Sequence, residues 1–200
     1  MNSGKLQENN VITNAEAIQK VFEQGAGYTD YVATGTSEQQ QRWEQMAGQV
    51  SLTEVQKELL AGFVREMKVL VLSGIWCGDC VEQCPLFAAI ADGSDKIDLR
   101  FVDRDEQEEL ADQIPICGGK RVPVAIFMAE DYQLCSVYGD RSLNRYRKLA
   151  EKQLGAACST GLFLPGEDEI SVQLQDWLNE FERIQLLLRL STRLRKKYGD

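Results

Sequence analysis

The spacing of apolar and polar positions divides the chain into a helical beginning, a middle that alternates strands with helices, and a helical end. Between Leu52 and Met67 apolar residues recur every three or four positions, which predicts a helix that buries one face. The Gly- and Thr-rich segment 25–37 is expected to be a loop. Two pairs have the spacing of a capping box at a helix start: Thr13 with Glu16, and Ser51 with Glu54. We therefore expect two or three helices before residue 68.

After residue 67 the pattern changes to short, nearly continuous apolar runs, which are typical of strands covered on both faces. Strands are expected at 68–73, 97–102, 122–128 and 133–138, and helices at 78–91, 105–114 and 142–154. The turn-like residues 129–131 separate the last two strands, which predicts an antiparallel hairpin. This order of elements predicts an α/β fold, with a central mixed sheet of about four strands flanked by helices.

From residue 171 onward the apolar positions again follow helical spacing and predict one long amphipathic helix with a basic last turn. We expect its apolar face to pack on the N-terminal helices, while dimerisation through that face is the alternative. The chain is therefore expected to be a monomer or a weak homodimer. It divides into a helical N-terminal extension (1–67), a core domain (68–155) and a C-terminal helical extension (156–200).

Composition narrows the classes of partner. With 200 residues, 44% of them hydrophobic, the chain can build a packed core without disulfides. A net charge of -9 disfavours binding to nucleic acid or to anionic membranes. The first ten residues lack the basic start and apolar stretch of a secretory signal, and no run approaches the roughly 20 apolar residues of a spanning helix. We therefore expect a cytoplasmic protein with no nucleic-acid and no membrane partner.

The titratable residues limit the chemistry further. Histidine is absent, which excludes Ser-His and Cys-His catalysis and imidazole metal ligands. Cysteines occur at positions 77, 80, 84, 117, 135 and 158. Six cysteines are too few for a disulfide scaffold in a chain of this size, so most of them are expected to be free thiols in a reducing cytosol.

The motif Trp76-Cys77-Gly78-Asp79-Cys80 follows a predicted strand and opens a predicted helix. At a helix N-terminus, unpaired backbone N–H groups and the helix dipole favour the thiolate form of the first cysteine, the form that attacks disulfides. The second sulfur lies one turn later and can close a small disulfide ring. The motif therefore predicts thiol-disulfide exchange, with Cys77 attacking and Cys80 resolving.

This order of strand, WCGDC, helix, strand, helix and a strand opened by Val122-Pro123 resembles the thioredoxin family over roughly residues 68–155. The resemblance implies the three-layer thioredoxin-like fold. It also implies a cis bond before Pro123, which faces the sulfurs, and pairing of the Val122 backbone with a substrate chain. Trp76, Gly78 and Asp79 would be the neighbours of the redox pair.

A closer likeness is to a bacterial thioredoxin-like subgroup with a helical N-terminal extension, a CGDC-type site and a Gly-Gly-Lys-x-x-Pro stretch. The matching residues here are Gly118, Gly119, Lys120 and Pro123, and Tyr138-Gly139-Asp140-Arg141 after the hairpin is also similar. The resemblance implies a disulfide-containing protein or small molecule as substrate and an external thiol reductant or reductase. The implied reaction requires no metal and no organic cofactor.

Three positions depart from the typical thioredoxin pattern, and the first is Val81, which stands where a lysine is usual. Asp79 stands where a proline is usual, and its carboxylate is expected to raise the pKa of the Cys77 thiol and to favour a reducing couple. Val71 stands where a buried acid is usual, so the common proton acceptor for the second thiol is missing. Asp79 is a substitute acceptor only if the geometry allows it, and the alternative is an ordinary first-turn acid.

Other interpretations stay open at this point. The fold could serve as a redox-inactive binding or scaffolding module. Cys84 and Cys117 could join the redox pair in a four-thiolate metal cluster, or Cys84 could act as a resolving or regulatory thiol. A peroxide-reducing enzyme is disfavoured, because the chain has no cysteine with the usual flanking threonine and proline pattern.

Overall fold

The computed structural model describes residues 10–154 and 168–199. Four strands form a single sheet in the order β2-β1-β3-β4. They are β1 (Met67–Ser73), β2 (Ile97–Asp103), β3 (Val124–Ala129) and β4 (Leu134–Gly139). β1 pairs with β2 in parallel, whereas β3 pairs antiparallel with both β1 and β4. The predicted mixed sheet and its terminal hairpin are confirmed.

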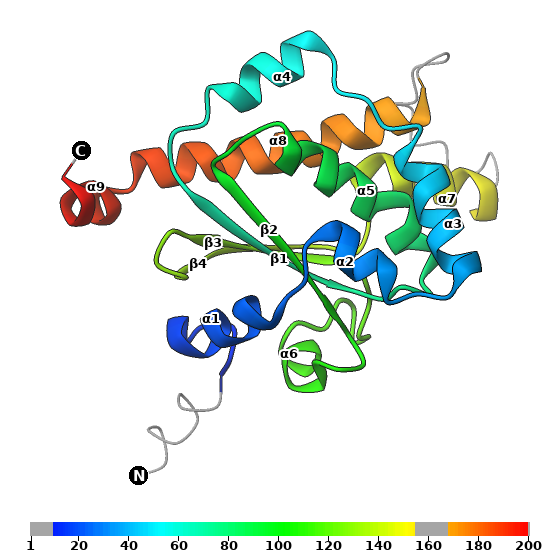
Figure 1. Cartoon of the computed structure of the whole chain (residues 1–200), viewed down its shortest axis with the longest axis horizontal. Helices are drawn as coiled ribbons and strands as arrows, with labels where there is room; N and C mark the ends of the chain where they lie inside the picture. Colours follow the sequence, from blue (N-terminus) through cyan, green and yellow to red (C-terminus); the bar gives the residue numbers. More distant parts are fainter. Residues whose placement is uncertain (1–9, 155–167, 200) are drawn as a thin grey trace.

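Helices surround this sheet in the described part of the chain. They are α1 (Ala15–Gln24), α2 (Tyr28–Ala33), α3 (Ser37–Ala47), α4 (Glu54–Ala61), α5 (Gly78–Asp92), α6 (Glu108–Gln113), α7 (Leu143–Leu154), α8 (Glu169–Leu190) and α9 (Thr192–Tyr198). α5 and α8 lie on one side of the sheet, and α1 and α6 lie on the other (Figure 1). The predicted three-layer α/β arrangement is therefore confirmed. Within residues 10–154 and 168–199, no helix combines the length and apolar character needed to cross a membrane.

The helix starts near the N-terminus differ from the predicted ones. Asn14, one residue after Thr13, caps α1 through its side-chain oxygen. Thr53, two residues after Ser51, caps α4 and forms a capping box with Gln56. Both predicted pairs were therefore wrong. The cap is the residue at which the extended backbone turns helical, and a spacing of three between suitable side chains recurs at neighbouring positions in polar segments.

The two segments around α4 and α2 also differ from their predictions. The stripe 52–67 is not one buried helix, because α4 ends at Ala61 and Met67 already belongs to β1. Val55 is 75% exposed and Val64 is 58% exposed. The predicted loop 25–37 contains α2, a helix of 6 residues that buries Tyr31 and Val32. A helix this short is not stable by itself, so these tertiary contacts must hold it.

The C-terminal segment is two helices, not one. Ser191 interrupts the helical run, and its side chain accepts a hydrogen bond from the Leu194 backbone N–H to cap α9. The apolar face of α8 packs mainly on α5, α7 and β4, so the predicted packing on the N-terminal helices was wrong. The physical reason is that the sheet and α5 offer α8 large aromatic side chains, such as Phe127 against Phe181 at 5.1 Å between ring centroids.

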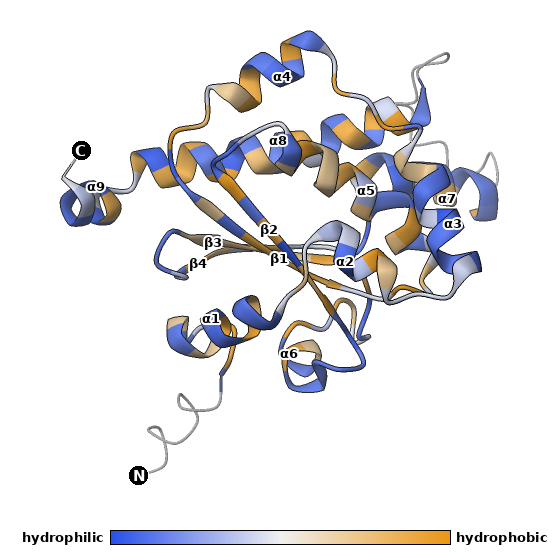
Figure 2. Cartoon of the chain, viewed as in Figure 1, coloured by the Kyte–Doolittle hydropathy of each residue, from blue (hydrophilic) through white to orange (hydrophobic). Residues whose placement is uncertain are grey.

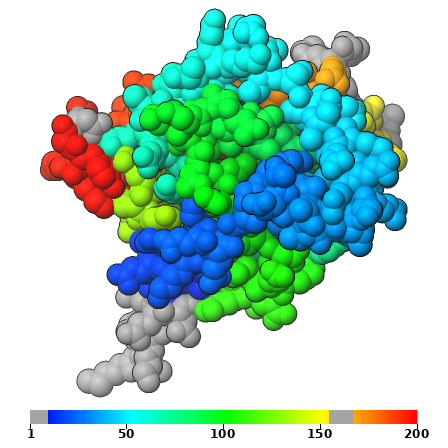
Figure 3. Space-filling view, in the orientation of Figure 1, coloured from blue at the N-terminus to red at the C-terminus, as the bar shows by residue number. Residues whose placement is uncertain are grey.

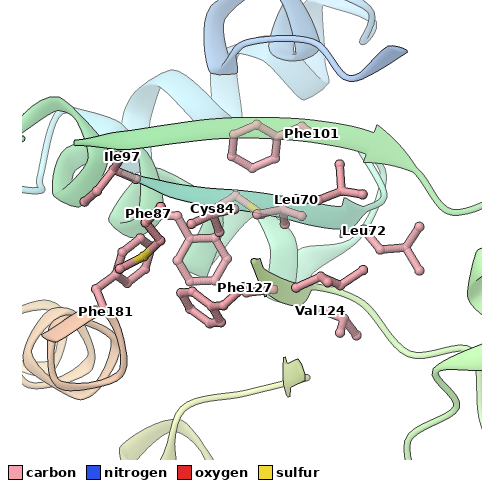
Figure 4. Packing of buried hydrophobic residues seen from close by; sticks show 14 of the residues in the cluster. Leu70, Leu72, Cys84, Phe87, Ile97, Phe101, Val124, Phe127 and Phe181 are labelled. Carbon is pink, nitrogen blue, oxygen red and sulfur yellow. The ribbon is translucent and has the colours of Figure 1, made fainter. Parts of the chain in front are cut away.

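The core lies between the sheet and the helices that cover it. β1 is mostly hydrophobic, β2 alternates hydrophobic with charged residues, and the helices carry their apolar positions as stripes (Figure 2). Phe87, Phe101, Phe127 and Phe181 are fully or almost fully buried, and Cys84 lies among them (Figure 4). In the space-filling view the segments from α1 to α4, coloured blue to cyan, spread over the visible face and close against α5 and β2 (Figure 3).

Candidate active site

The Cys-x-x-Cys motif lies where β1 passes into α5. β1 ends at Ser73, Cys77 is the N-cap of α5, and the turn between them is closed by the Cys77 N–H bonding to the Gly74 carbonyl at 2.9 Å. The indole N–H of Trp43 on α3 donates to the carbonyl of Ile75 at 3.0 Å and fixes the same turn. A Cβ at Gly74 would lie 2.8 Å from the Trp76 ring, so a larger residue here would displace that ring.

The two thiols of the motif are neighbours with different exposure. Cys77 is partly exposed and Cys80 is fully buried, and both are free thiols. They lie close enough for each thiol to shift the pKa of the other. Trp76, which is 44% exposed, and Gly78 border them at the surface. Cys77 is therefore the member of the pair that an incoming molecule can reach.

The electrostatics of the pair differ from the expectation based on the helix N-terminus. The hydrogen bond with Cys80, followed by burial, raises the pKa of the Cys77 thiol, while the backbone N–H groups of Cys80 and Asp79 act to lower it. Burial raises the pKa of the Cys80 thiol. The helix terminus thus contributes as predicted, but the second thiol and desolvation outweigh it.

The segment before β3 completes the surroundings of Cys77. The Cys77 Sγ lies 3.6 Å from the Val122 carbonyl oxygen, although 45 positions separate the two residues in sequence. The Val122–Pro123 peptide bond is cis, and both side chains are buried. The structure therefore brings the backbone of Val122 to the partly exposed sulfur.

Asp79 is held by arginines of the segment that follows the hairpin. Its Oδ2 lies 2.5 Å from Nη2 of Arg141, and its Oδ1 lies 3.5 Å from Nη2 of Arg145. Arg145 also bridges to Glu82 at 2.7 Å. The sequence predicted that the Asp79 carboxylate raises the pKa of Cys77. In the structure the principal causes of the raised pKa are the Cys80 thiol and burial. Two guanidinium groups lie beside this carboxylate and oppose its charge.

Buried polar contacts join this arginine segment to α5 and α8. The side chain of Gln83 donates to the Asp140 carbonyl at 2.9 Å and accepts from the Ser142 N–H at 3.0 Å. Its Oε1 also accepts from the Trp177 indole N–H at 3.1 Å. Arg145 and Gln83 were missed by sequence reasoning, because an arginine or glutamine on a helix is ordinary in composition. For Arg141, the likeness of residues 138–141 to the thioredoxin-like subgroup was a signal.

Trp76 has a cationic partner that the sequence did not indicate. The guanidinium of Arg104 lies over the Trp76 ring, 4.6 Å from its centroid. The same side chain donates to the Lys120 carbonyl at 3.2 Å. Trp76 is therefore linked to the loop that precedes Val122.

The remaining cysteines differ in their relation to the pair: Cys84 contributes to the raised pKa of Cys80, whereas Cys117 is exposed. Cys84 is buried, with its Sγ 3.6 Å from the Ser73 hydroxyl, whereas Cys117 is exposed. Cys158 lies outside the described residues. Among the described residues, no group of three or more Cys, Asp or Glu side chains is arranged to hold a metal ion. The four-thiolate cluster considered from the sequence therefore has no geometric support, since Cys117 and Cys84 lie in opposite environments.

Comparison with known families follows this geometry. A family model described as thioredoxin matches residues 25–152, which contain the motif and Val122-Pro123. The chain belongs to this thioredoxin family. The match begins before α2, so α2, α3 and α4 lie within the matched stretch together with the sheet.

Solved structures share the thioredoxin-like fold. A protein of unknown function, PA1234 from Pseudomonas aeruginosa, aligns with a TM-score of 0.62 and 17% identity, covering 82% of this chain and 95% of that one. An HIV 4E10 epitope-scaffold aligns with a TM-score of 0.60 and 16% identity, covering 80% and 97%. At these identities the likeness supports the fold alone. A search of curated proteins found no match.

The Arg141 contact gives a test of how this thioredoxin-family site controls its first thiol. Arg141→Met leaves the Asp79 carboxylate with Arg145 alone, at 3.5 Å. The less neutralised carboxylate should raise the pKa of Cys77 further and slow its alkylation. The measurement is the pH dependence of iodoacetamide alkylation at Cys77. Arg141→Lys keeps the positive charge and should shift the pKa of Cys77 less. The double variant Arg141→Met with Asp79→Asn should show no shift, because it has no carboxylate. An unchanged profile in Arg141→Met would contradict this role.

Proposed function

We propose that this thioredoxin-family protein is a thiol-disulfide oxidoreductase that reduces disulfides of a protein or small-molecule substrate through Cys77 and Cys80. The observation that carries the proposal is the pairing of a partly exposed thiol with a buried one at the N-terminus of α5. Accessibility suits Cys77 for attack, and burial keeps Cys80 from reacting with solvent molecules before the substrate is attached.

The proposed reaction has two exchange steps. The Cys77 thiolate attacks one sulfur of the substrate disulfide, which forms a mixed disulfide and releases the other sulfur as a thiolate. Cys80 then loses its proton and attacks the Cys77 sulfur, so that the second substrate thiolate leaves and the Cys77–Cys80 disulfide forms. Two electrons pass to the substrate. An external thiol reductant or reductase returns the pair to the dithiol, and the proposal uses no metal or organic cofactor.

The surroundings of the pair support the direction of this reaction and the place of the substrate. A strongly stabilised thiolate makes a couple oxidising, and here the neighbouring thiol and burial raise the pKa of Cys77. A reducing couple is therefore favoured. The Val122 carbonyl, 3.6 Å from Cys77 Sγ, is positioned to align an extended substrate backbone. We propose the cytoplasm as the working compartment, because its thiol pool keeps such pairs reduced.

Insulin reduction by dithiothreitol tests the proposal. The purified protein should accelerate the appearance of insulin turbidity above the rate with dithiothreitol alone. The matched control is Cys117→Ser, which removes an exposed thiol outside the motif and should retain the full rate. A wild-type rate equal to the background would contradict the proposal.

Alkylation separates the proposal from a redox-inactive binding module of the same fold. Brief treatment of the native reduced protein with iodoacetamide at neutral pH, followed by mass spectrometry, should label Cys77 and leave Cys80 and Cys84 unlabelled. A binding module with a covered site predicts no label on any of the three. Label on Cys80 ahead of Cys77 would reverse the roles assigned here.

A further inference from the structure

The segment that leads into Val122 is flanked by arginines, which differ in how many of their N–H donors are already used. Arg104 donates from Nε and Nη2 to the Asp105 carboxylate and from Nη1 to the Lys120 carbonyl. Its guanidinium also lies over the Trp76 ring. All three nitrogens of Arg104 are therefore engaged within the protein.

The two arginines that follow the hairpin are engaged in a similar way. Nη2 of Arg141 lies 2.5 Å from the Asp79 carboxylate, and its Nη1 lies 3.4 Å from Oδ2 of Asp140. Arg145 uses Nη2 for Asp79 and Nη1 for Glu82. The Nε atoms of both arginines are buried. Each terminal nitrogen of the two arginines thus has a partner, and neither Nε can be reached by a substrate.

Arg121 differs from these three arginines in its exposure and in its unused donors. It directly precedes Val122, whose carbonyl oxygen lies 3.6 Å from Cys77 Sγ. Its side chain is 42% exposed, and its Nη1 lies 3.2 Å from Oδ2 of Asp140. Within the described part of the chain, Nε and Nη2 of Arg121 have no partner. A guanidinium carries five N–H donors in a planar fork, so Arg121 presents several of them at the edge of the site.

A buried carboxylate holds Arg121 in this place. Asp140 is 2% exposed, and its carboxylate also binds Arg141 and accepts from the Tyr146 hydroxyl. Because Arg141 in turn binds Asp79, polar contacts run without a gap from Arg121 to the first turn of α5. The Asp140 carboxylate is shared between two guanidinium groups, so it orients Arg121 without taking up its whole charge. An arginine oriented in advance loses less conformational entropy when it binds a ligand.

We propose that Arg121 binds a carboxylate of the substrate beside the reacting disulfide, so that disulfides with an acidic neighbour are preferred. This inference rests on the proposed function and names its substrate class. Arginine and a carboxylate form charge-assisted hydrogen bonds, and the Nε and Nη2 donors that Arg121 has unused are the ones with which Arg104 holds Asp105. The neighbouring cation, Lys120, is paired with Asp112 at 2.7 Å. Since the net charge of -9 repels acidic molecules at a distance, the preference depends on this short-range contact.

The experiment compares small symmetrical disulfides of similar size and different charge: anionic dithiodiglycolate, neutral hydroxyethyl disulfide and cationic cystamine. All variants carry Cys80→Ser, so that the adduct formed by attack of Cys77 accumulates. Mass spectrometry of acid-quenched samples, with peptide mapping, gives the rate constant of adduct formation on Cys77 for each disulfide. Arg121→Gln should lower the ratio of the anionic to the neutral rate constant about tenfold, the effect of losing a hydrogen bond between charged groups. Arg121→Glu should lower this ratio further and raise the ratio of the cationic to the neutral rate constant.

Arg100→Gln is the matched control for the loss of one positive charge. Arg100 lies on β2, its side chain is 43% exposed, and its Nε lies 3.0 Å from the Asp98 carboxylate. Its substitution should leave both ratios at the values of the Cys80→Ser parent. An anionic-to-neutral ratio that Arg121→Gln does not change, or that Arg100→Gln lowers equally, would overturn the carboxylate site. No adduct on Cys77 with any of the disulfides would instead overturn the proposed function.

Discussion

The Cys80→Ser variant is expected to accumulate a mixed disulfide on Cys77 that persists at least ~10³ times longer than in the wild type. The two thiols are held in contact at the start of α5, so attack by Cys80 has the advantage of an intramolecular reaction. Effective molarities of such reactions far exceed the millimolar thiol concentrations that must replace Cys80. Catalytic turnover of insulin should therefore be lost although the first exchange still occurs.

Mass spectrometry of the intact, acid-quenched protein checks this expectation. Cys80→Ser should carry one substrate adduct, assigned to Cys77 by peptide mapping, while Cys77→Ser should carry no adduct at the motif. The matched control is Cys84→Ser, which removes a buried thiol one helical turn away and should not trap an adduct. An adduct on Cys77 that decays as quickly in Cys80→Ser as in the wild type would show that Cys80 does not resolve it.

Trp177→Ala is expected to lower the free energy of unfolding by about 3–5 kcal/mol, the usual range for truncating a buried tryptophan. Trp177 on α8 is fully buried, and its ring meets Phe87 of α5 at 4.4 Å and Tyr138 of β4 at 5.0 Å between centroids. Its indole N–H donates to Gln83, which also binds the backbone beside Arg141. The substitution should therefore also loosen the segment that holds Asp79.

Urea unfolding measures the loss of unfolding free energy in Trp177→Ala, and the m-value should stay the same as in the wild type. Trp177→Phe keeps an aromatic ring but loses the donor to Gln83, and should cost less than Trp177→Ala. Leu190→Ala on the same helix, at a position that is 77% exposed, should change the free energy of unfolding by no more than about 0.5 kcal/mol. Equal losses in the alanine variants of Trp177 and Leu190 would contradict the packing described here.

The helices before the sheet supply contacts to the site. Trp43 of α3 donates to the carbonyl of Ile75 in the turn before Cys77, and Tyr31 of α2 donates to Asp103 at the end of β2. The family match also includes α2, α3 and α4. Because the Trp43 contact fixes the turn that precedes Cys77, removal of residues 25–61 would alter the site.

The sequence by itself determined the strands and the helix that carries the redox motif. Nearly continuous apolar runs form β1 and β3, the two central strands, since a strand covered on both faces cannot place polar side chains in water. β2, at the edge of the sheet, alternates apolar with charged residues and is only partly buried. The sequence also places the motif between a strand and a helix, because the apolar run of β1 ends at Ser73 and the helix α5 begins within the motif. These features depend on residues that are neighbours in the chain, so local pattern is sufficient to predict them.

Only the tertiary structure decided the contacts that modify the redox pair. The approach of Arg141 to Asp79 joins residues 62 positions apart, and that of Tyr31 to Asp103 joins residues 72 apart. The same holds for α2, which the sequence indicated as a loop and which forms because Tyr31 stacks on Phe101. Charge pairing and aromatic packing act between surfaces that meet on folding, so no local spacing of residues reports them.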